Sequence, residues 1–424
     1  MENDYLTGLP NHKNFLIQGQ DIVSNSNESF VAVSLDVSNF KYLNDMYGLE
    51  CGDEVIKLIA NYFFIDDESM ALATRITSDQ FRAIFTMEGR TIEEEMAYLS
   101  EKCARLEKIL SKTYPKVYLH TYCGVYEIDK TNFNMRIAID KSHFAKKEIK
   151  GNYQISCSLY KDEEFNDKSA QMKMICTFEN ACAADGIKLF FQPKFDCSRN
   201  KLIGAEALCR LMDEEGNILG PRQFIPVLEK SGMLSHLDEI MMRKTFECMK
   251  IWDEHGKLNF PVSINVSRIN FFNRDIVKQV SDMQQEYGIP ANMVELEITE
   301  TTFIENLNTI RESVIQLRDK GFRISVDDFG SGYSSLGLIT SIPADVIKLD
   351  CSFAREGLKT PKGIKIIESI ISMLKSVDFD IICEGIETSE EARLVETLGC
   401  SKIQGYLYDK PMGAEEFSKK YIFV

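Results

Sequence analysis

Acidic side chains in the second half of the chain follow short apolar runs. The run "RISVDD" ends in Asp327 and Asp328, and the glycine-containing loop "FGSGYSSL" comes next. Two adjacent aspartates repel each other and neither favours a strand, so solvent, a cation or a substrate must compensate their charge. Other oxygen donors follow or lie within similar runs, namely Glu206, Asn265, Glu297 and Glu384.

These six side chains provide five carboxylates and one amide carbonyl, with no His or Cys among them. Such hard oxygen donors suit Mg²⁺ or Mn²⁺ and disfavour zinc. Six ligands around one octahedral ion would leave no open position. Two ions about 3.5–4 Å apart, with one carboxylate bridging them, keep water sites free and serve in-line displacement at phosphorus. Lys348 would add a positive charge for the phosphate or the attacking hydroxide, and Arg210 could clamp phosphate.

Each of these residues also has a purely structural interpretation. Asp327 and Asp328 could form a capping turn, Lys348 could be an edge-strand lysine, and Glu384 and Glu387 could cap the helix "SEEARLVETLG". One oxygen or cationic donor at each strand end favours a functional site over these separate explanations.

The elements that would hold these residues alternate along the chain from Leu189 onward. Short apolar runs are usually followed by segments with helical spacing, and their number and span of about 240 residues are those of a (β/α)₈ barrel. The runs are "IKLFFQ", "LIGAEAL", "PVSINV", "MVELEI", "FRISVDD", "DVIKLD", "FDIICE" and "KIQGY".

The first two runs are too close together for a crossover helix, because parallel strands need a connection of a dozen or more residues. They should form a hairpin, with the first strand antiparallel to the rest. A turn near residues 198–200 would place Gln192 directly opposite Glu206.

Residues 1–156 predict a compact α+β domain. It contains the strand "FVAVSLD", the helix "DEVIKLIANYFF" and a hairpin closed by Thr77, Ser78 and Asp79. Residues 157–174 are expected to be a linker, because 157–169 are charged and poor in apolar side chains, and residues 175–424 to be the barrel.

The composition is that of a globular protein, with 44% hydrophobic and 27% charged residues. A net charge of −16 argues against a nucleic-acid polymer as partner. The 12 cysteines are scattered without a CxxC pair, which favours free thiols in a reducing cytoplasm. No run of about 18 apolar residues and no signal peptide is visible. Because Met1 closely precedes "DYLTGLPN", the sequence could also be a fragment of a longer, membrane-associated sensor.

Residues 175–420 resemble the EAL family of cyclic di-GMP phosphodiesterases. The resemblance rests on several motifs in order: "QPKFD", "GAEALCRL", "INVS", "ELEITET", "VDDFGSGYSSL", "IKLD", "CEGIET" and "IQGYLYDKPM". It implies a modified TIM barrel with an antiparallel first strand. It also implies hydrolysis of cyclic di-GMP to linear pGpG with two Mg²⁺ or Mn²⁺ ions.

The resemblance also implies a role for each matching residue. Asp327 would bridge the two ions, and Lys348 would orient the water. The first ion would be held by Glu206, Asn265, Glu297 and Asp327, and the second by Asp327, Asp328 and Glu384. Further roles would fall to Glu387 and Gln404 in the active site, to Gln192, Arg210 and Gln404 as substrate contacts, and to Glu300 as support of the loop after Asp328. Whether Lys348, Asp328 or Glu384 takes the proton of the water stays open.

Residues 1–156 resemble an eroded GGDEF domain of the diguanylate cyclase family, through "DYLTGLPN" and "LDVSNFKYLNDMYGLECGDEV". Asp36 and Asp79 match metal ligands, and Asn44 and Asp53 match guanine contacts. The signature reads "TSDQF", so both glycines that let backbone approach a nucleotide are missing. We expect no useful cyclase activity. GTP binding as a regulatory signal is a hypothesis.

A non-catalytic receptor for cyclic di-GMP is the alternative function, and a two-activity enzyme is a third. We further expect Ca²⁺ to inhibit, because it prefers longer bonds and looser geometry than Mg²⁺. A homodimer through the barrel loop 329–343 is expected from the family.

Overall fold

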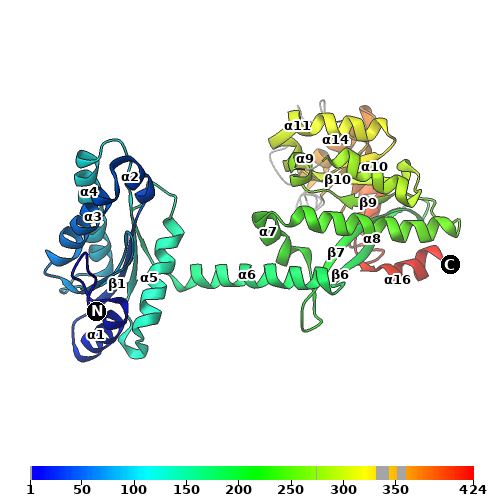
Figure 1. The fold of residues 1–424 in the computed structure, drawn as a ribbon. Helices are drawn as coiled ribbons and strands as arrows, with labels where there is room; N and C mark the ends of the chain where they lie inside the picture. The colour runs from blue at the N-terminus through cyan, green and yellow to red at the C-terminus, as the bar shows by residue number, and fades with distance from the viewer. Residues whose placement is uncertain (1, 274, 331–342, 351–359) are drawn as a thin grey trace. The chain divides into compact units, whose positions relative to one another are not determined.

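The structure, a computed structural model, describes residues 2–273, 275–330, 343–350 and 360–424 (Figure 1). The chain divides into two compact units, Met1–Ala170 and Gln171–Val424. None of the described helices is both long enough and apolar enough to span a bilayer.

The first unit is built on a five-stranded sheet with the order β2-β3-β1-β4-β5. The central strand β1 is antiparallel to β3 and β4, while β5 is parallel to β4. The strands are β1 (Phe30–Val37), β2 (Met70–Thr77), β3 (Gln80–Thr86), β4 (Thr121–Glu127) and β5 (Cys157–Leu159). The predicted hairpin is confirmed, since Thr77 pairs with Gln80 across the turn.

Helices cover both faces of this sheet, because successive side chains of β1 point to opposite sides. Val31, Val33 and Leu35 pack in one hydrophobic core, and Phe30 and Ala32 pack in a second. The first core includes side chains of α3 (Leu49–Ile59) and α4 (Ile92–Thr113), and the second includes side chains of α1 (His12–Asn25) and α5 (Met135–Ile149). A short helix, α2 (Phe40–Tyr47), precedes α3. This is the expected α+β arrangement.

The segment expected to be a linker is regular structure. Residues 157–159 form β5, and residues 162–183 form one helix, α6 (Asp162–Ala183), which contains the boundary between the units. The charged side chains that suggested a linker include Asp162, Glu163 and Glu164 in the first turn of α6, where acidic residues favour helix formation.

The second unit is a closed eight-stranded barrel, as predicted. Its first strand is antiparallel to both neighbours, and the other neighbouring pairs are parallel. The barrel strands are β6 (Ile187–Asp196), β7 (Lys201–Met212), β9 (Val262–Asn265), β10 (Val294–Thr299), β11 (Arg323–Phe329), β12 (Val346–Leu349), β13 (Asp380–Cys383) and β14 (Lys402–Gln404). Two short strands, β8 (Ile218–Leu219) and β15 (Met412–Gly413), pair with β7 and β6. The hairpin register places Gln192 opposite Glu206, as expected.

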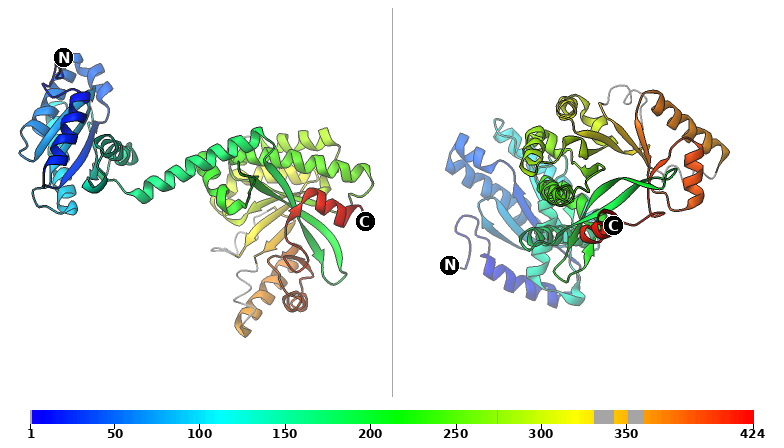
Figure 2. Two further views of the ribbon diagram at one scale, coloured as in Figure 1. Left: turned by 90° about the horizontal axis from the view of Figure 1, so that it is seen from below. Right: turned by 90° about the vertical axis from the view of Figure 1, so that its right-hand side faces the viewer.

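Helices lie around the barrel, and α16 packs against β6 (Figures 1 and 2). They are α7 (Pro221–Ser231), α8 (Leu234–Glu254), α9 (Ile269–Asn273), α10 (Ile276–Tyr287), α11 (Glu300–Asp319), α14 (Pro361–Ser376), α15 (Ser389–Thr397) and α16 (Ala414–Phe417). On β10, Val294, Leu296 and Ile298 join the hydrophobic core. The alternating Glu295 and Glu297 therefore face the barrel interior, which accumulates buried charge.

Candidate functional site

Two groups of carboxylates lie at the C-terminal ends of the parallel barrel strands and share one member. Glu206, Glu297 and Asp327 form the first group, and Asp327, Asp328 and Glu384 form the second. Within each group, one oxygen of every residue lies within 4.8 Å of the others. The structure thus brings together the five carboxylates singled out from the sequence, with Asp327 common to both groups.

A break in strand β11 explains how two adjacent aspartates can join one group. Neighbouring side chains of a regular strand point to opposite faces. The pairing of β11 with β12 shifts between Val326 and Phe329, and Asp328 has a φ of 56°. Aspartate tolerates this left-handed conformation better than most residues, and such a bulge re-aims a side chain. The capping turn considered from the sequence is therefore a strand bulge.

The ammonium group of Lys348 lies among the same carboxylates. Its Nζ is 2.8 Å from Glu297 Oε2 and from Glu384 Oε1, 2.9 Å from Asp327 Oδ1 and 3.2 Å from Glu206 Oε2. The side chain is only 1% exposed, so Lys348 is not an edge-strand lysine. Lys348 is on β12, which lies between β11 and β13 in the barrel. Its side chain therefore lies between Asp327 on β11 and Glu384, which follows β13.

A second buried lysine, Lys194 on β6, contacts one carboxylate of this site, Glu297, inside the barrel. Its Nζ donates to Glu297 Oε1 at 2.8 Å, to Glu295 Oε1 at 2.9 Å and to Ser263 Oγ at 2.8 Å. Each oxygen of Glu297 is thereby held by a different lysine. Gly204 makes room for the lysine stem, since a Cβ there would lie 3.3 Å from Lys194 Cδ.

Sequence reasoning missed Lys194 and Glu295. The alternating pattern of "VELEI" was a usable signal, because both of its glutamates had to face the same side of the strand. The partner lysine comes from a strand about 100 residues earlier, so only the closure of the barrel brings it near.

Burial and mutual repulsion shift the pKa values of these carboxyl groups in different directions. Burial, reinforced by Asp327, raises the pKa of Asp328 to about 6. Burial also raises the pKa of Glu206, and it raises that of Glu384 well above its usual range, although Lys348 opposes both shifts. Burial acts the same way on Glu297, but Lys194 and Lys348 outweigh it and hold its pKa well below the usual range. The charge of the group is thus only partly compensated, which is what a cation site requires.

A cavity of about 500 Å³ opens at these strand ends. It is lined by Gln192, Glu206, Leu208, Arg222, Asp327, Asp328, Lys348, Asp350, Glu384, Gly385, Glu387, Gln404, Gly405 and Tyr406. Arg222 and Tyr406 were not foreseen, and together they add a cation and an aromatic ring to the lining. The cavity therefore combines oxygen donors with groups suited to phosphate and to a base.

Four predicted polar residues form one hydrogen-bonded group, and three of them, Gln192, Glu206 and Gln404, line the cavity. The Nε2 of Gln404 donates to Glu206 Oε2 at 2.6 Å and to Gln192 Oε1 at 3.2 Å. On the other side, the Nδ2 of Asn265 donates to Glu206 Oε1 at 2.9 Å. Both oxygens of Glu206 are therefore positioned by amides.

The remaining predicted residues of the barrel lie as follows. Arg210 is not part of the cavity lining, and its guanidinium stacks 5.1 Å from the centre of the Phe190 ring. Glu387 lines the cavity, and helix α15 is capped instead by Thr388 together with Glu391. Glu300 is buried and its Oε2 accepts a hydrogen bond from the backbone N–H of Gly330 at 3.0 Å. The loop 329–343 was expected to form a homodimer contact. Most of it, residues 331–342, lies outside the described residues.

In the first unit, the candidate ligands Asp36 and Asp79 also meet, but with internal partners. Asp36 Oδ2 accepts hydrogen bonds from Lys150 at 2.8 Å and Lys146 at 3.2 Å. Burial is outweighed by hydrogen bonds from Asp79 and Lys150, so the pKa of Asp36 is about 2. Burial and the contact with Asp36 raise the pKa of Asp79 to about 6.

The two candidate guanine contacts lie on consecutive helices of the first unit. Asn44 is on α2, and its Oδ1 is buried with no hydrogen-bond partner in the described part of the chain. Asp53 is exposed on α3. Gly52 allows α3 to approach Asn44, since a Cβ there would lie 2.0 Å from Asn44 Oδ1.

Comparison with protein families assigns both units. Residues 175–411 match the EAL domain, and residues 1–154 match the diguanylate cyclase GGDEF domain. The chain therefore belongs to the EAL family, with a GGDEF domain preceding the EAL domain. Within this family, domains of this type generally depend on divalent metal ions.

Two curated relatives share both domains. The chain is 27% identical over 424 residues to the signaling protein YkoW of Bacillus subtilis, covering 98% of this chain and 52% of that protein. It is 27% identical over 425 residues to the bifunctional diguanylate cyclase/cyclic di-GMP phosphodiesterase MucR of Pseudomonas aeruginosa, covering 98% of this chain and 61% of that protein. The chain thus spans little more than half the length of these relatives.

Among solved structures, the phosphodiesterase PaMucR in complex with c-di-GMP superimposes with a TM-score of 0.55 at 28% identity. The match covers 58% of this chain and 99% of that chain. The match supports the barrel architecture.

Proposed function

We propose that the EAL domain hydrolyses cyclic di-GMP to linear pGpG with the help of two divalent cations, Mg²⁺ or Mn²⁺. The observation that carries the proposal is the pair of carboxylate groups sharing Asp327 in the wall of a cavity. The oxygen-only donor set and the raised pKa of Glu206 and Glu384 fit such ions. The cyclic di-GMP in the complex of the similar PaMucR supports the choice of substrate.

Glu206, Asn265, Glu297 and Asp327 would hold one ion, and Asp327, Asp328 and Glu384 the other. When bound, the ions would lower the pKa of a water molecule and neutralise charge on the phosphodiester. Asn265 would serve through its amide oxygen, which requires the side chain to turn from its present contact with Glu206.

The other residues of the site would bind and orient. The positive charge of Lys348, fixed by its ion pairs, would hold the attacking water and the phosphate. Gln192 and Gln404, which line the cavity, would contact the substrate, Arg210 would reach it from outside the lining, and Glu387 would act in the cavity. The contact from Gly330 supports Glu300 as an anchor of the loop after Asp328. The proton of the water would pass to Lys348, Asp328 or Glu384.

The proposal is tested by incubating the protein with cyclic di-GMP and Mg²⁺ and following pGpG by chromatography. Wild type should convert the substrate, and Glu206→Ala should not, because the variant loses one direct ligand. Glu254→Gln, at an exposed position on α8, serves as the control and should stay active. Tight binding of intact substrate by wild type would favour the receptor function instead.

We also propose that the GGDEF domain binds GTP as a signal without making cyclic di-GMP. The unpartnered oxygen of Asn44 supports this, because a guanine N–H could satisfy it once the side chain turns away from Gly52. Titration calorimetry with GTP and Mg²⁺ should show binding that Asn44→Ala weakens, and absence of heat in wild type would refute it. Formation of cyclic di-GMP from GTP would contradict the lack of cyclase activity.

A further inference from the structure

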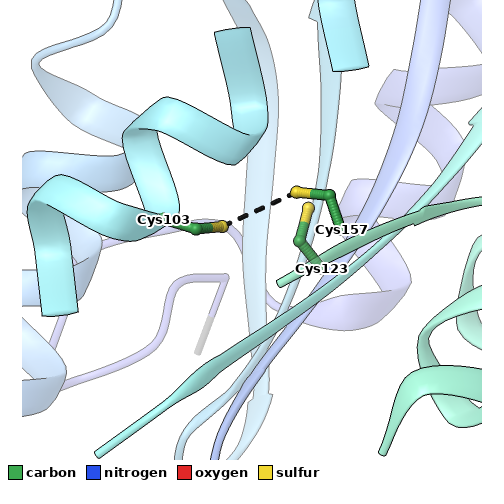
Figure 3. A group of neighbouring side chains, drawn as sticks. All are labelled: Cys103, Cys123 and Cys157. Atoms are coloured by element: carbon green, nitrogen blue, oxygen red, sulfur yellow. Dashed lines mark hydrogen bonds between the residues drawn. The ribbon is translucent and has the colours of Figure 1, made fainter. Parts of the chain in front are cut away.

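Three cysteines converge in the core of the first unit (Figure 3). Cys103 comes from α4, Cys123 from β4 and Cys157 from β5. Their sulfur atoms lie within 4.8 Å of one another, and Cys103 Sγ is 3.8 Å from Cys157 Sγ. They are scattered in sequence, so the fold alone assembles them.

The spacing of these sulfurs fits metal ligands better than a disulfide. Sulfurs bound about 2.3 Å from a tetrahedral ion lie about 3.8 Å from each other, whereas a disulfide bond is about 2.0 Å long. Any single disulfide would also leave the third thiol unpaired. Cys123 and Cys157 are direct neighbours in the parallel pairing of β4 and β5, which fixes their relative position.

The three thiols are shielded from solvent. Cys103 and Cys123 are fully buried, and Cys157, a half-buried residue, contributes to the same buried group. Among the described residues, no carboxylate or imidazole belongs to the group.

We propose that Cys103, Cys123 and Cys157 bind a thiophilic d¹⁰ metal ion, Zn²⁺ or Cu⁺. Thiolate ligands select such ions, and three sulfurs suit three-coordinate Cu⁺ or Zn²⁺ with a water as fourth ligand. The ion would join the three-residue edge strand β5 to α4 and β4. Since β5 directly precedes α6, the site would secure the point where the chain leaves the GGDEF domain.

The test uses Cd²⁺ as a spectroscopic probe on the reduced, metal-free full chain. Cadmium bound by thiolates gives an ultraviolet charge-transfer band that carboxylate ligands do not give, so the acidic site of the barrel does not interfere. We expect one thiolate-bound Cd²⁺ per chain. Cys157→Ser should weaken its binding at least about 10-fold, whereas Cys176→Ser, at an exposed position, should leave it unchanged.

Competition then distinguishes the two candidate ions: Cu⁺ should displace Cd²⁺ stoichiometrically, whereas Zn²⁺, which thiolates bind more weakly than Cd²⁺, should displace it only in large excess. A second measurement covers a variant that fails to fold. In wild type, the metal should protect residues 103, 123 and 157 from alkylation, detected by mass spectrometry, while Cys176 still reacts. Absence of the band, an equal band in Cys157→Ser, or disulfide formation with oxidised glutathione in place of metal uptake would overturn the proposal.

Discussion

Both domains bring two aspartates together, but they balance the resulting charge differently. In the EAL domain, Asp327 and Asp328 join three glutamates, and these five carboxylates face two ammonium groups, those of Lys348 and Lys194. In the GGDEF domain, Asp36 receives two lysines, and Asp79 shares a hydrogen bond with it.

This difference is the reason for proposing cations at the EAL carboxylates and not at Asp36 and Asp79. Carboxylates that outnumber their cationic partners gain from a divalent ion, because it removes their repulsion. In the GGDEF domain two ammonium groups already face the two carboxylates, so a divalent ion would have less repulsion to relieve and would have to displace those contacts first. The eroded signature and the lysine pairs are the two features on which our proposal of a GGDEF domain without cyclase activity rests.

The sharpest test replaces one aspartate of each pair. Asp327→Asn should lower cyclic di-GMP hydrolysis at least about 100-fold, because both carboxylate groups lose their shared member. Asp79→Asn should leave hydrolysis unchanged. The two rates are compared by pGpG formation at saturating Mg²⁺, and a fully active Asp327→Asn would remove the proposed two-ion site.

The role of Lys194 is tested with the double variant Lys194→Met and Glu295→Gln. The second substitution removes the charge that Glu295 would otherwise keep in the interior without its lysine partner. Glu297 then loses one of its two ammonium partners. The Mg²⁺ concentration for half-maximal activity should rise about 10- to 100-fold, with activity recovering at high Mg²⁺. Lys201→Met, exposed on the same hairpin, is the matched control. An unchanged metal requirement would limit Lys194 to a structural role.

Divalent ions should stabilise the barrel selectively. An ion at 100 times its dissociation constant adds about 2.7 kcal/mol to the free energy of unfolding. Trp252, the only tryptophan, is buried in the EAL domain and reports its unfolding by fluorescence. Both Mg²⁺ and Ca²⁺ should raise the midpoint in wild type and not in Asp327→Asn, while Ca²⁺ inhibits hydrolysis. Equal stabilisation of the variant would place the ions elsewhere.

The smallest expected effect is a pH dependence in the GGDEF domain. The pKa of Asp79 is about 6 in the folded domain, above its unfolded value of about 3.9. The folded state therefore binds more protons between these values, and Asp79 makes the domain lose stability as pH rises through that window. Asp36, with a pKa of about 2, acts oppositely and only at lower pH.

Asp79→Asn cannot ionise, so the difference in unfolding free energy between wild type and variant should change from pH 4 to pH 6. Urea unfolding followed by circular dichroism, with Trp252 fluorescence reporting the barrel separately, measures this difference. A constant difference across the window would show that Asp79 is not held protonated by Asp36.

The sequence by itself determined the strand pattern, the antiparallel first hairpin with Gln192 opposite Glu206, and the carboxylates at the strand ends. These features follow from alternation and connection length, which are local properties. The charge of residues 157–169 predicted a linker, and the boundary between the units follows directly after them, but their regular structure, β5 and the first turns of α6, was not predicted.

Only the tertiary structure decided how the chosen residues meet. The bulge that turns Asp328 toward Asp327, the insertion of Lys194 beneath Glu297, and the convergence of three cysteines all depend on strands distant in the chain. Side-chain alternation indicates which face a residue occupies. Which neighbour the side chain meets on that face is set by the closure of the sheet and by local irregularities such as bulges. Both depend on packing across the whole fold.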